Sequence, residues 1–328
     1  MNFLLRRIMF YLAAMWVALS LNFLIPRMMP GDPATRMFNR AKGKMSPEAL
    51  QGLKDAFGFT DGNLMDQYIS YFKALLQGDL GISMMFFPEP VAEKLLYAAY
   101  WTLLLAGTGT LISFIIGTAL GAIAAWRRGG SLDTWGTPLA VLLQSATPAV
   151  VALFLFWGFA IEWQLFPLGR AYDIYLTPSF SWVFISSVLY YGALPLLSIV
   201  LVSLGQWHFT MRNNMIGLLD EDYLLLAKAK GLSNHRILVH YAARNAILPS
   251  INAFAMAIGL VLAGSLFTEV VFNYPGLGLF VLKAIQARDY AFIQGQLLFV
   301  TMGVLASNFI GDLLNVALDP RLRTGASV

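Results

Sequence analysis

Six long apolar stretches determine what this chain can fold into. A membrane-spanning helix needs about 20 predominantly apolar residues, because inside the bilayer its backbone must satisfy its own hydrogen bonds. The first stretch follows Arg6 and Arg7 and has no small-x-small cleavage motif behind it, which predicts a retained span rather than a signal peptide. The sequence therefore predicts an all-α integral membrane protein with six transmembrane helices. The expected spans lie near residues 8–25, 98–126, 134–161, 180–206, 247–272 and 293–317.

The composition supports this fold class and excludes several functions. The chain of 328 residues is 58% hydrophobic and 12% charged, whereas about a quarter of a soluble domain is charged. The net charge of +4 does not indicate a nucleic-acid partner, because Lys and Arg follow the loops beside apolar runs. The absence of cysteine excludes disulfides, thiolate metal sites and cysteine nucleophiles.

Basic residues also predict how the spans are oriented. Arg127 and Arg128 connect the second and third spans, and further Lys and Arg lie between the fourth and fifth spans and in the tail. Basic connections are expected on the cytoplasmic side, which places both termini there. The expected organisation is a first transmembrane helix at 1–29, an extracytoplasmic domain at 30–97, a five-helix core at 98–317 and a cytoplasmic tail at 318–328.

Local patterns add detail to this organisation. The Ser-Pro-Glu sequence at 46–48 predicts the start of a helix that runs to about residue 57. Apolar residues at helical spacing predict a second amphipathic helix over 64–76, which ends at Gly78. Within the spans, prolines predict kinks and small residues four apart predict close helix packing. The prolines are Pro148 and Pro195, and the small pairs are Gly117 with Gly121 and Ala255 with Gly259.

The polar interval at 220–249 is the main candidate for a functional surface. It combines alternating charges with Leu, Ile and Tyr at helical spacing, which predicts two amphipathic helices, a turn at Gly231 and a stop at Pro249. Such a hairpin, in the connection 208–246 between two spans, presents a surface to a partner in water. No phosphate-binding loop of the G-x-x-x-x-G-K-[ST] type occurs, so any ATP must be bound by another chain.

Few ionisable residues lie in or near the spans. Glu269, one turn before the end of the fifth span, is either part of a translocation route or structural, whereas Glu162 and Asp312 are expected in structural roles at span ends. The segment 273–292, which opens with NYPGLG, is either an interfacial loop or a re-entrant segment that closes a pore. The three histidines are not spaced as metal ligands, and no metal site is expected.

Several short motifs occur along the chain in a characteristic order. They are MMPGDPA, GDLGIS, EDY…AKAKGL…HYAARNAILP, E…FNYPGLG with AI…RDY…IQG, and DLL…DPRLR. Together they resemble the inner-membrane permease subunits of binding-protein-dependent ABC importers, in the dipeptide, oligopeptide and nickel branch. The resemblance implies a type I importer fold in the cell membrane of a bacterium or archaeon. It also implies a second homologous permease, two cytoplasmic ATPase subunits that bind ATP and Mg, an extracytoplasmic solute-binding protein, and no cofactor in this chain.

The resemblance identifies the polar hairpin as the EAA loop, the element that docks into the ATPase. The motif's second alanine and its glycine match Ala227 and Gly231, but its glutamate falls at Leu225, and Ala291 stands where the branch usually has proline. The implied ATPase-coupling residues are Glu221, Asp222, Tyr223, Ala227, Lys228, Lys230, Gly231 and Arg236. The implied residues of the translocation pathway and outer gate are Glu269, Phe272, Tyr274, Pro275, Gly276 and Gly278.

The expected function is that of a permease subunit without its own nucleotide site, not an enzyme. Peptides are the first expected substrate class, oligosaccharides the second and nickel the third. The aromatic residues Trp157, Trp163, Trp182 and Phe272 either stack on a sugar or anchor the chain at the membrane interface, and the second role is favoured. A self-contained secondary transporter or channel would commonly show internal repeats, and an intramembrane enzyme a nucleophile with its base; neither signature is visible.

Overall fold

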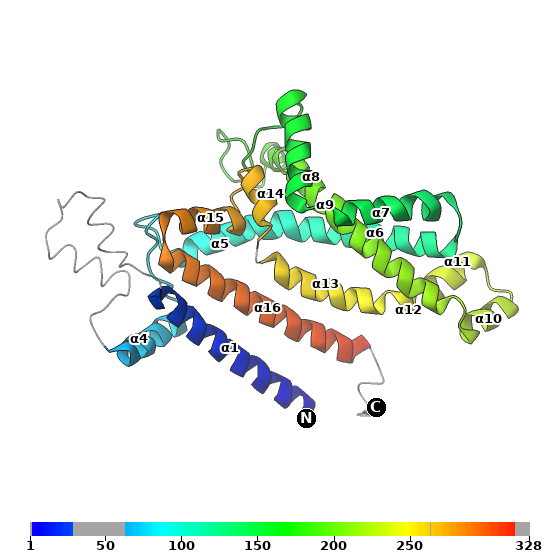
Figure 1. Ribbon diagram of the computed structural model, residues 1–328, viewed down its shortest axis with the longest axis horizontal. Helices are drawn as coiled ribbons and strands as arrows, with labels where there is room; N and C mark the ends of the chain where they lie inside the picture. Colours follow the sequence, from blue (N-terminus) through cyan, green and yellow to red (C-terminus); the bar gives the residue numbers. More distant parts are fainter. Residues whose placement is uncertain (1, 29–62, 263, 319–328) are drawn as a thin grey trace. The chain divides into compact units, whose positions relative to one another are not determined.

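The computed structural model describes residues 2–28, 63–262 and 264–318. Regular secondary structure within these ranges is helical, apart from one β-bridge between Ile82 and Pro90. The helices are labelled along the chain in Figure 1. They belong to two compact units. The first unit is Met1–Thr102, Leu262–Leu266 and Pro275–Ala306, and the second is Leu103–Val261, Phe267–Tyr274 and Ser307–Val328.

Among the described residues, four helical stretches are long and apolar enough to cross a membrane, and two bent helix pairs bring the number to as many as six. The predicted helical membrane protein is confirmed, while the count of six spans stays a prediction. The four stretches are Arg7–Leu24, Val91–Trp126, Trp182–Leu218 and Tyr290–Leu313. The pairs are Leu132–Ser145 with Pro148–Glu162, bent by 100°, and Asn234–Ala246 with Leu248–Val261, bent by 52°.

The predicted span at 247–272 is wrong. Helix α13 (Leu248–Val261) ends well before residue 272, and a separate short helix, α14 (Leu266–Val271), follows. The chain turns at Gly264, whose φ of +87° lies in the left-handed region that glycine adopts without strain. The apolar run is therefore divided between two helices, and Gly264 lies in the interval between them.

Two other predicted spans change their limits. Pro148 begins the new helix α8 (Pro148–Leu155) instead of kinking one continuous helix, as its fixed φ and missing N–H favour. Helix α9 (Trp182–Leu218) passes through Pro195 and extends beyond residue 206. Residues 208–218 thus belong to this helix and not to the predicted connection 208–246.

In the first unit, α1 packs on both α4 and α16. The hydroxyls of Ser20 and Tyr68 lie 2.7 Å apart, and Asn22 Nδ2 donates to the Gln294 carbonyl oxygen at 2.8 Å. The predicted amphipathic helix at 64–76 is confirmed as α4, whereas the helix predicted to end near residue 57 lies outside the described residues. Helix α5 starts at Val91 rather than at 98. The elements are α1 (Asn2–Met28), α4 (Leu64–Leu76), α5 (Val91–Thr102), α15 (Leu277–Ala287) and the first part of α16 (Tyr290–Leu318).

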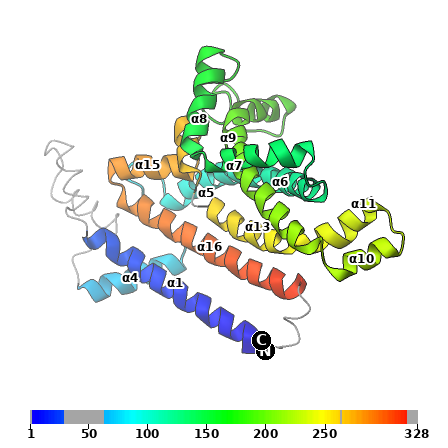
Figure 2. The ribbon, with the colours of Figure 1, turned by 45° about the vertical axis from the view of Figure 1, so that its right-hand side comes forward.

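In the second unit, α6 and α7 pack along α9 (Figure 2). The predicted close packing at Gly117 is confirmed: a Cβ there would lie 2.8 Å from the Leu204 carbonyl oxygen. A Cβ at Gly121 would collide with the carbonyl oxygen of His208. The elements that precede α9 are η1 (Leu103–Gly107), α6 (Thr108–Trp126), η2 (Leu132–Gly136), α7 (Thr137–Ser145), α8 and η3 (Phe156–Glu162).

Candidate functional site

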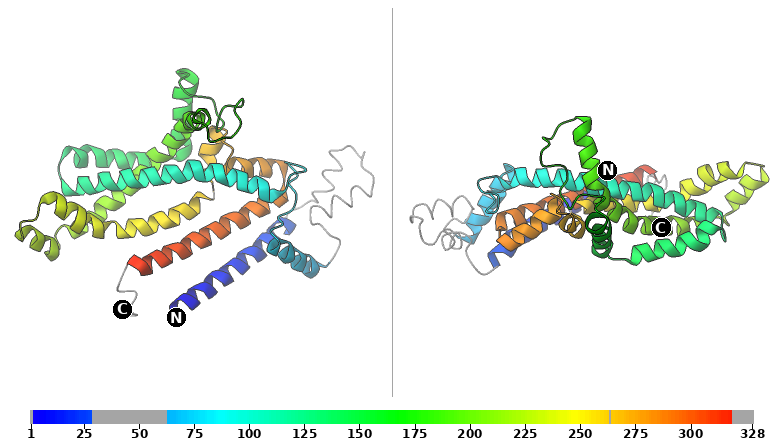
Figure 3. Two further views of the ribbon diagram at one scale, coloured as in Figure 1. Left: turned by 180° about the vertical axis from the view of Figure 1, so that it is seen from behind. Right: turned by 90° about the horizontal axis from the view of Figure 1, so that it is seen from above.

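The polar interval after α9 forms a helical hairpin (Figures 2 and 3). Its first arm ends at Gly231, which has a φ of +72° and whose N–H donates to the Lys228 carbonyl oxygen at 2.9 Å. Ser233 caps the second arm, because its Oγ accepts from the N–H of Arg236 at 3.4 Å. The predicted hairpin with a turn at Gly231 is confirmed, and Pro249 lies in the first turn of α13. The arms are α10 (Asp222–Ala229), and α11 (Asn234–Arg236) with η4 (Ile237–Ala243) and α12 (Arg244–Ala246).

The inner face of the hairpin is apolar and buried. It packs against the ends of α6 and α9, so that burial of apolar surface, worth about 25 cal/mol per Å², holds the three elements together. Ala227 is only 3% exposed and belongs to this cluster. This predicted coupling residue therefore packs inside the chain, where its side chain cannot contact a partner. The cluster is Ala122, Ala125, Met211, Met215, Leu224, Ala227, Ile237, Ala242 and Ala246.

The outer face of the hairpin carries the predicted charges. The exposed residues of the predicted set are Glu221, Asp222, Lys228, Lys230, Gly231 and Arg236. The acids stand at the start of α10 and a lysine in its last turn, as the helix dipole favours. Tyr223 is half-buried, and its hydroxyl accepts from Asn245 Nδ2 at 3.3 Å, which joins the two arms.

An exposed pair of leucines on α10 was missed by the sequence reasoning. Leu225 and Leu226 are 53% and 56% exposed, whereas the neighbouring Leu224 is 1% exposed. Three consecutive leucines cannot all face one side of a helix, but the sequence alone did not show which one would be buried. Leu225, which stands where the motif has glutamate, therefore lies on the outer face of the hairpin. It adds apolar surface among the charged side chains.

Three of the predicted pathway residues form a packed turn in the second unit. Glu269, Phe272 and Tyr274 are at most 1% exposed. The Phe272 ring meets that of Phe156 edge to face, with centroids 5.6 Å apart, and its carbonyl oxygen accepts from the N–H of Arg170 at 3.0 Å. The N–H of Tyr274 donates to the Glu269 carbonyl oxygen at 2.8 Å. Phe272 is thus a core residue of this chain and offers no exposed ring for a sugar.

The other three predicted pathway residues start a helix in the first unit. Gly276 and Gly278 are buried, and Pro275 is half-buried. The N–H of Leu277, the first residue of α15, donates to Thr102 Oγ1 at 2.8 Å. The segment 273–292 is consequently mostly helical, in α15 and the start of α16, and only its first residues and a short turn near Arg288 are irregular.

Asp289 is a site residue whose role sequence reasoning missed. Its side chain is fully buried, and Oδ2 accepts from Ser83 Oγ at 2.5 Å and from the N–H of Met85 at 3.0 Å. Its Oδ1 accepts from the N–H of Phe292 at 3.1 Å, in the first turn of α16. The GDLGIS and RDY motifs, 206 residues apart at Ser83 and Asp289, therefore meet at one carboxyl group.

Replacement of Asp289 with alanine is expected to destabilise the first unit by about 3 kcal/mol or more, because three donors, two of them buried and one partly buried, lose their acceptor. The measurement is the thermal midpoint of the purified chain in detergent. Asp79→Ala is the matched control, since Asp79 is exposed and, within the described residues, accepts from the N–H of Gly81 alone. Equal midpoints for the two variants would contradict the role assigned to Asp289.

The histidines do not converge. His208 is buried, with Nε2 3.1 Å from Thr137 Oγ1, whereas His235 and His240 are exposed on the hairpin. Within the described ranges there is no group of three His, Asp or Glu side chains that could hold a metal ion.

Known proteins that are similar to this chain match it over nearly its whole length. The family described as binding-protein-dependent transport system inner membrane component matches residues 117–324. The chain is 31% identical to the dipeptide transport system permease protein DppB of Bacillus subtilis, over 98% of each chain. It is 30% identical to DppB of Escherichia coli K12 and 29% identical to the glutathione transport system permease protein GsiC of Shigella flexneri, in each case over 98% of this chain and 99% of the relative. The chain therefore belongs to the family of binding-protein-dependent transport system inner membrane components.

Proposed function

We propose that this chain forms half of the translocation pathway of an ATP-driven importer and that residues 220–249 couple it to cytoplasmic ATPase subunits. The hairpin carries this proposal. Its inner face is packed on α6 and α9, while its charges and the leucine pair are exposed, so a partner bound outside can move the membrane helices with it. Members of the family are transport subunits, and the dependence on a binding protein implies the paired permease, ATPase and solute-binding partners.

The proposed topology has six spans and cytoplasmic termini, in the type I importer arrangement. The bent pair Leu132–Ser145 with Pro148–Glu162 supplies the third span. In the other pair, Asn234–Ala246 is the second arm of the hairpin, and only α13 belongs to the fifth span. The first span at 1–29 and the tail at 318–328 are kept. Because the second span starts at Val91, the proposed extracytoplasmic domain shortens from 30–97 to 30–90, and the core extends from 98–317 to 91–317. This topology is supported by the basic connections at Arg127 and Arg128 and in the hairpin.

Peptides are the proposed cargo. The relatives compared above are named for dipeptide and glutathione transport, and both cargoes are small peptides. These names give no support to the oligosaccharide or nickel alternatives. We assign Glu269, Phe272, Tyr274, Pro275, Gly276 and Gly278 to the outer gate as part of this proposal. Because five of them are buried within the chain, they would act by holding the turn in shape rather than by binding cargo.

The test is uptake by liposomes that contain the chain with its partner permease, ATPase subunits and solute-binding protein. Labelled dipeptide is expected to accumulate only when ATP and the binding protein are both present. The matched control contains this chain alone, which is expected to transport nothing. Accumulation by the chain alone would favour a secondary transporter or channel, and ATP-driven uptake of an oligosaccharide but not a peptide would overturn the proposed cargo.

A further inference from the structure

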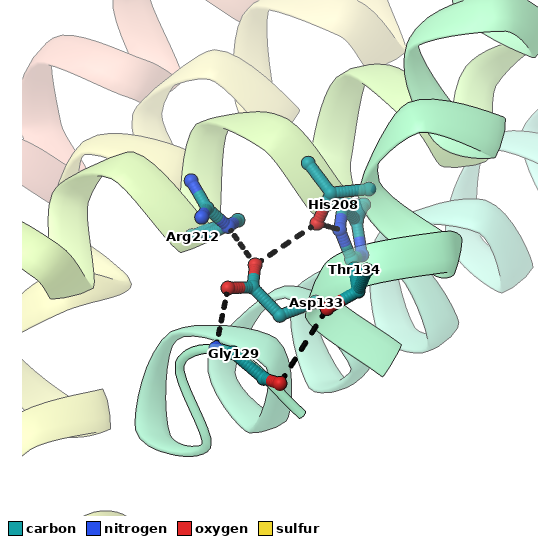
Figure 4. Close-up of polar contacts among 6 residues, drawn as sticks. Gly129, Asp133, Thr134, His208 and Arg212 are labelled. Atoms are coloured by element: carbon teal, nitrogen blue, oxygen red, sulfur yellow. Dashed lines mark hydrogen bonds and ion pairs between the residues drawn. The ribbon is translucent and has the colours of Figure 1, made fainter. Parts of the chain in front are cut away.

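A cluster of polar groups joins the turn after α6, η2 and the start of α7 to α9 (Figure 4). Arg212 Nε lies 2.7 Å from Asp133 Oδ1, and only 21% and 12% of their side chains are exposed. Asp133 Oδ2 accepts from the N–H of Gly129 at 3.0 Å, and Oδ1 accepts from Thr137 Oγ1 at 3.4 Å. Thr137 Oγ1 in turn lies 3.1 Å from His208 Nε2. The turn after α6 and the start of α7 are thereby joined to two successive turns of α9.

Helix α9, which carries His208 and Arg212 of this cluster, is also in close backbone contact with α6 and α7. A Cβ at Gly121 of α6 would lie 3.1 Å from the Arg212 nitrogen, and one at Gly205 of α9 would collide with the Ala140 carbonyl oxygen of α7. Helices α6 and α7 therefore lie directly against the backbone of α9. The two charged side chains are only partly exposed, which strengthens their attraction relative to a fully exposed pair.

The hairpin is attached to α6 and α9 in a different way. Met211 and Met215 of α9 share the apolar cluster with the hairpin and with Ala122 and Ala125 of α6. No residue of α7 belongs to that cluster. Helix α7 instead packs along α9, with Ala140 against Gly205, and the polar groups around Asp133 join its start and the preceding η2 to α9.

From this difference we infer that Asp133 and Arg212 are positioning residues that make α7 move together with the helix that bears the hairpin. A displacement of the hairpin is passed to α6 and α9 through apolar packing, and from α9 to α7 through the packing of these two helices together with this ion pair. The inference rests on the proposed function of the hairpin and extends it to two residues outside the 220–249 interval. Packed elements with discrete arrangements are suited to such transmission.

The test compares Asp133→Asn, Arg212→Gln and the double variant in the complete reconstituted importer. The number of dipeptides imported per ATP hydrolysed is expected to fall about fivefold or more, in the range of common coupling effects. Basal ATP hydrolysis and the yield of assembled complex are expected to stay unchanged. The double variant should be no worse than either single one, because all three break the same pair. Glu89→Gln is the matched control, since Glu89 pairs with Lys94 at 2.5 Å but is 47% exposed.

Three results would overturn the inference: an unchanged import ratio, additive losses in the double variant, or failure of the neutral variants to assemble, which would assign the pair to folding. A Gly231→Pro complex assayed in parallel separates this from the proposed function. If Gly231→Pro retains full stimulation of ATP hydrolysis by ligand-loaded binding protein, the hairpin assignment itself fails. If Gly231→Pro loses this stimulation but the Asp133 and Arg212 variants keep the normal ratio of dipeptides imported per ATP, the hairpin keeps its proposed function. The positioning role of Asp133 and Arg212 is then wrong.

Discussion

The Gly231→Pro variant is expected to insert into the membrane but to lose its ATPase subunits on purification. Proline fixes φ near −65°, whereas Gly231 has a φ of +72°. Proline also removes the N–H that donates to the Lys228 carbonyl oxygen. The turn between α10 and α11 cannot form in its present shape, so the exposed charges of the two arms lose their relative positions. Ligand-stimulated ATP hydrolysis should fall to the basal level, and co-purification of the ATPase subunits is the direct measurement.

Two matched variants isolate the cause. Gly231→Asn is expected to assemble nearly normally, because asparagine adopts the left-handed conformation more readily than other non-glycine residues. Gly78→Pro repeats the same change elsewhere: Gly78 has a φ of +76° and its N–H donates to the Leu75 carbonyl oxygen at 3.0 Å. A Cβ at either glycine would meet no atom within 4 Å. Loss of ATPase in the Gly78 variant, or its retention in Gly231→Pro, would remove the hairpin from the docking role.

The Gly121→Leu variant is expected to yield no monodisperse protein. The added Cβ would collide with the carbonyl oxygen of His208 and crowd the Arg212 nitrogen, and neither backbone group can move without displacing α9. Overpacking of this kind costs about 1–3 kcal/mol where side chains can adjust, and more where the obstacle is backbone. Size-exclusion chromatography of the detergent-solubilised chain, before and after mild heating, measures the effect.

Gly192→Leu provides the comparison for that experiment. Gly192 lies in α9, but a Cβ there would meet no atom within 4 Å, so a normal elution profile is expected. The pair of variants changes the same residue type to the same side chain and differs in the space available. A normal profile for Gly121→Leu would show that α6 and α9 do not pack as closely as described.

Local patterns predicted the elements whose geometry is set by their own residues. Helix α4 and the two-armed hairpin followed from apolar spacing, and the turn followed from Gly231. The break after Val261 could not be predicted, because the apolar run continues through it. The left-handed Gly264 lies in the interval between the two helices. A Cβ there would lie 2.7 Å from the backbone nitrogen of Gly278, which belongs to the later helix α15.

The same distinction holds for the candidate site. The exposed charges of the hairpin were predicted, since charged side chains stay at the surface unless they are paired. The burial of Ala227 and the exposure of Leu225 depend on where α6 and α9 approach the hairpin, which no local pattern records. The Asp133–Arg212 pair joins residues 79 positions apart, so single-sequence reasoning had no reason to associate them.

The length of α9 has a mechanical consequence. Its 37 residues span about 55 Å at 1.5 Å per residue, whereas the hydrocarbon layer of a bilayer is about 30 Å thick. A rod of this length that tilts by about 5° moves its far end by about 5 Å, close to one helical turn. A displacement of the hairpin by about one helical turn thus requires only a slight tilt of α9 within the lipid. In the same way, a small tilt that begins at the other end of α9 would displace the hairpin.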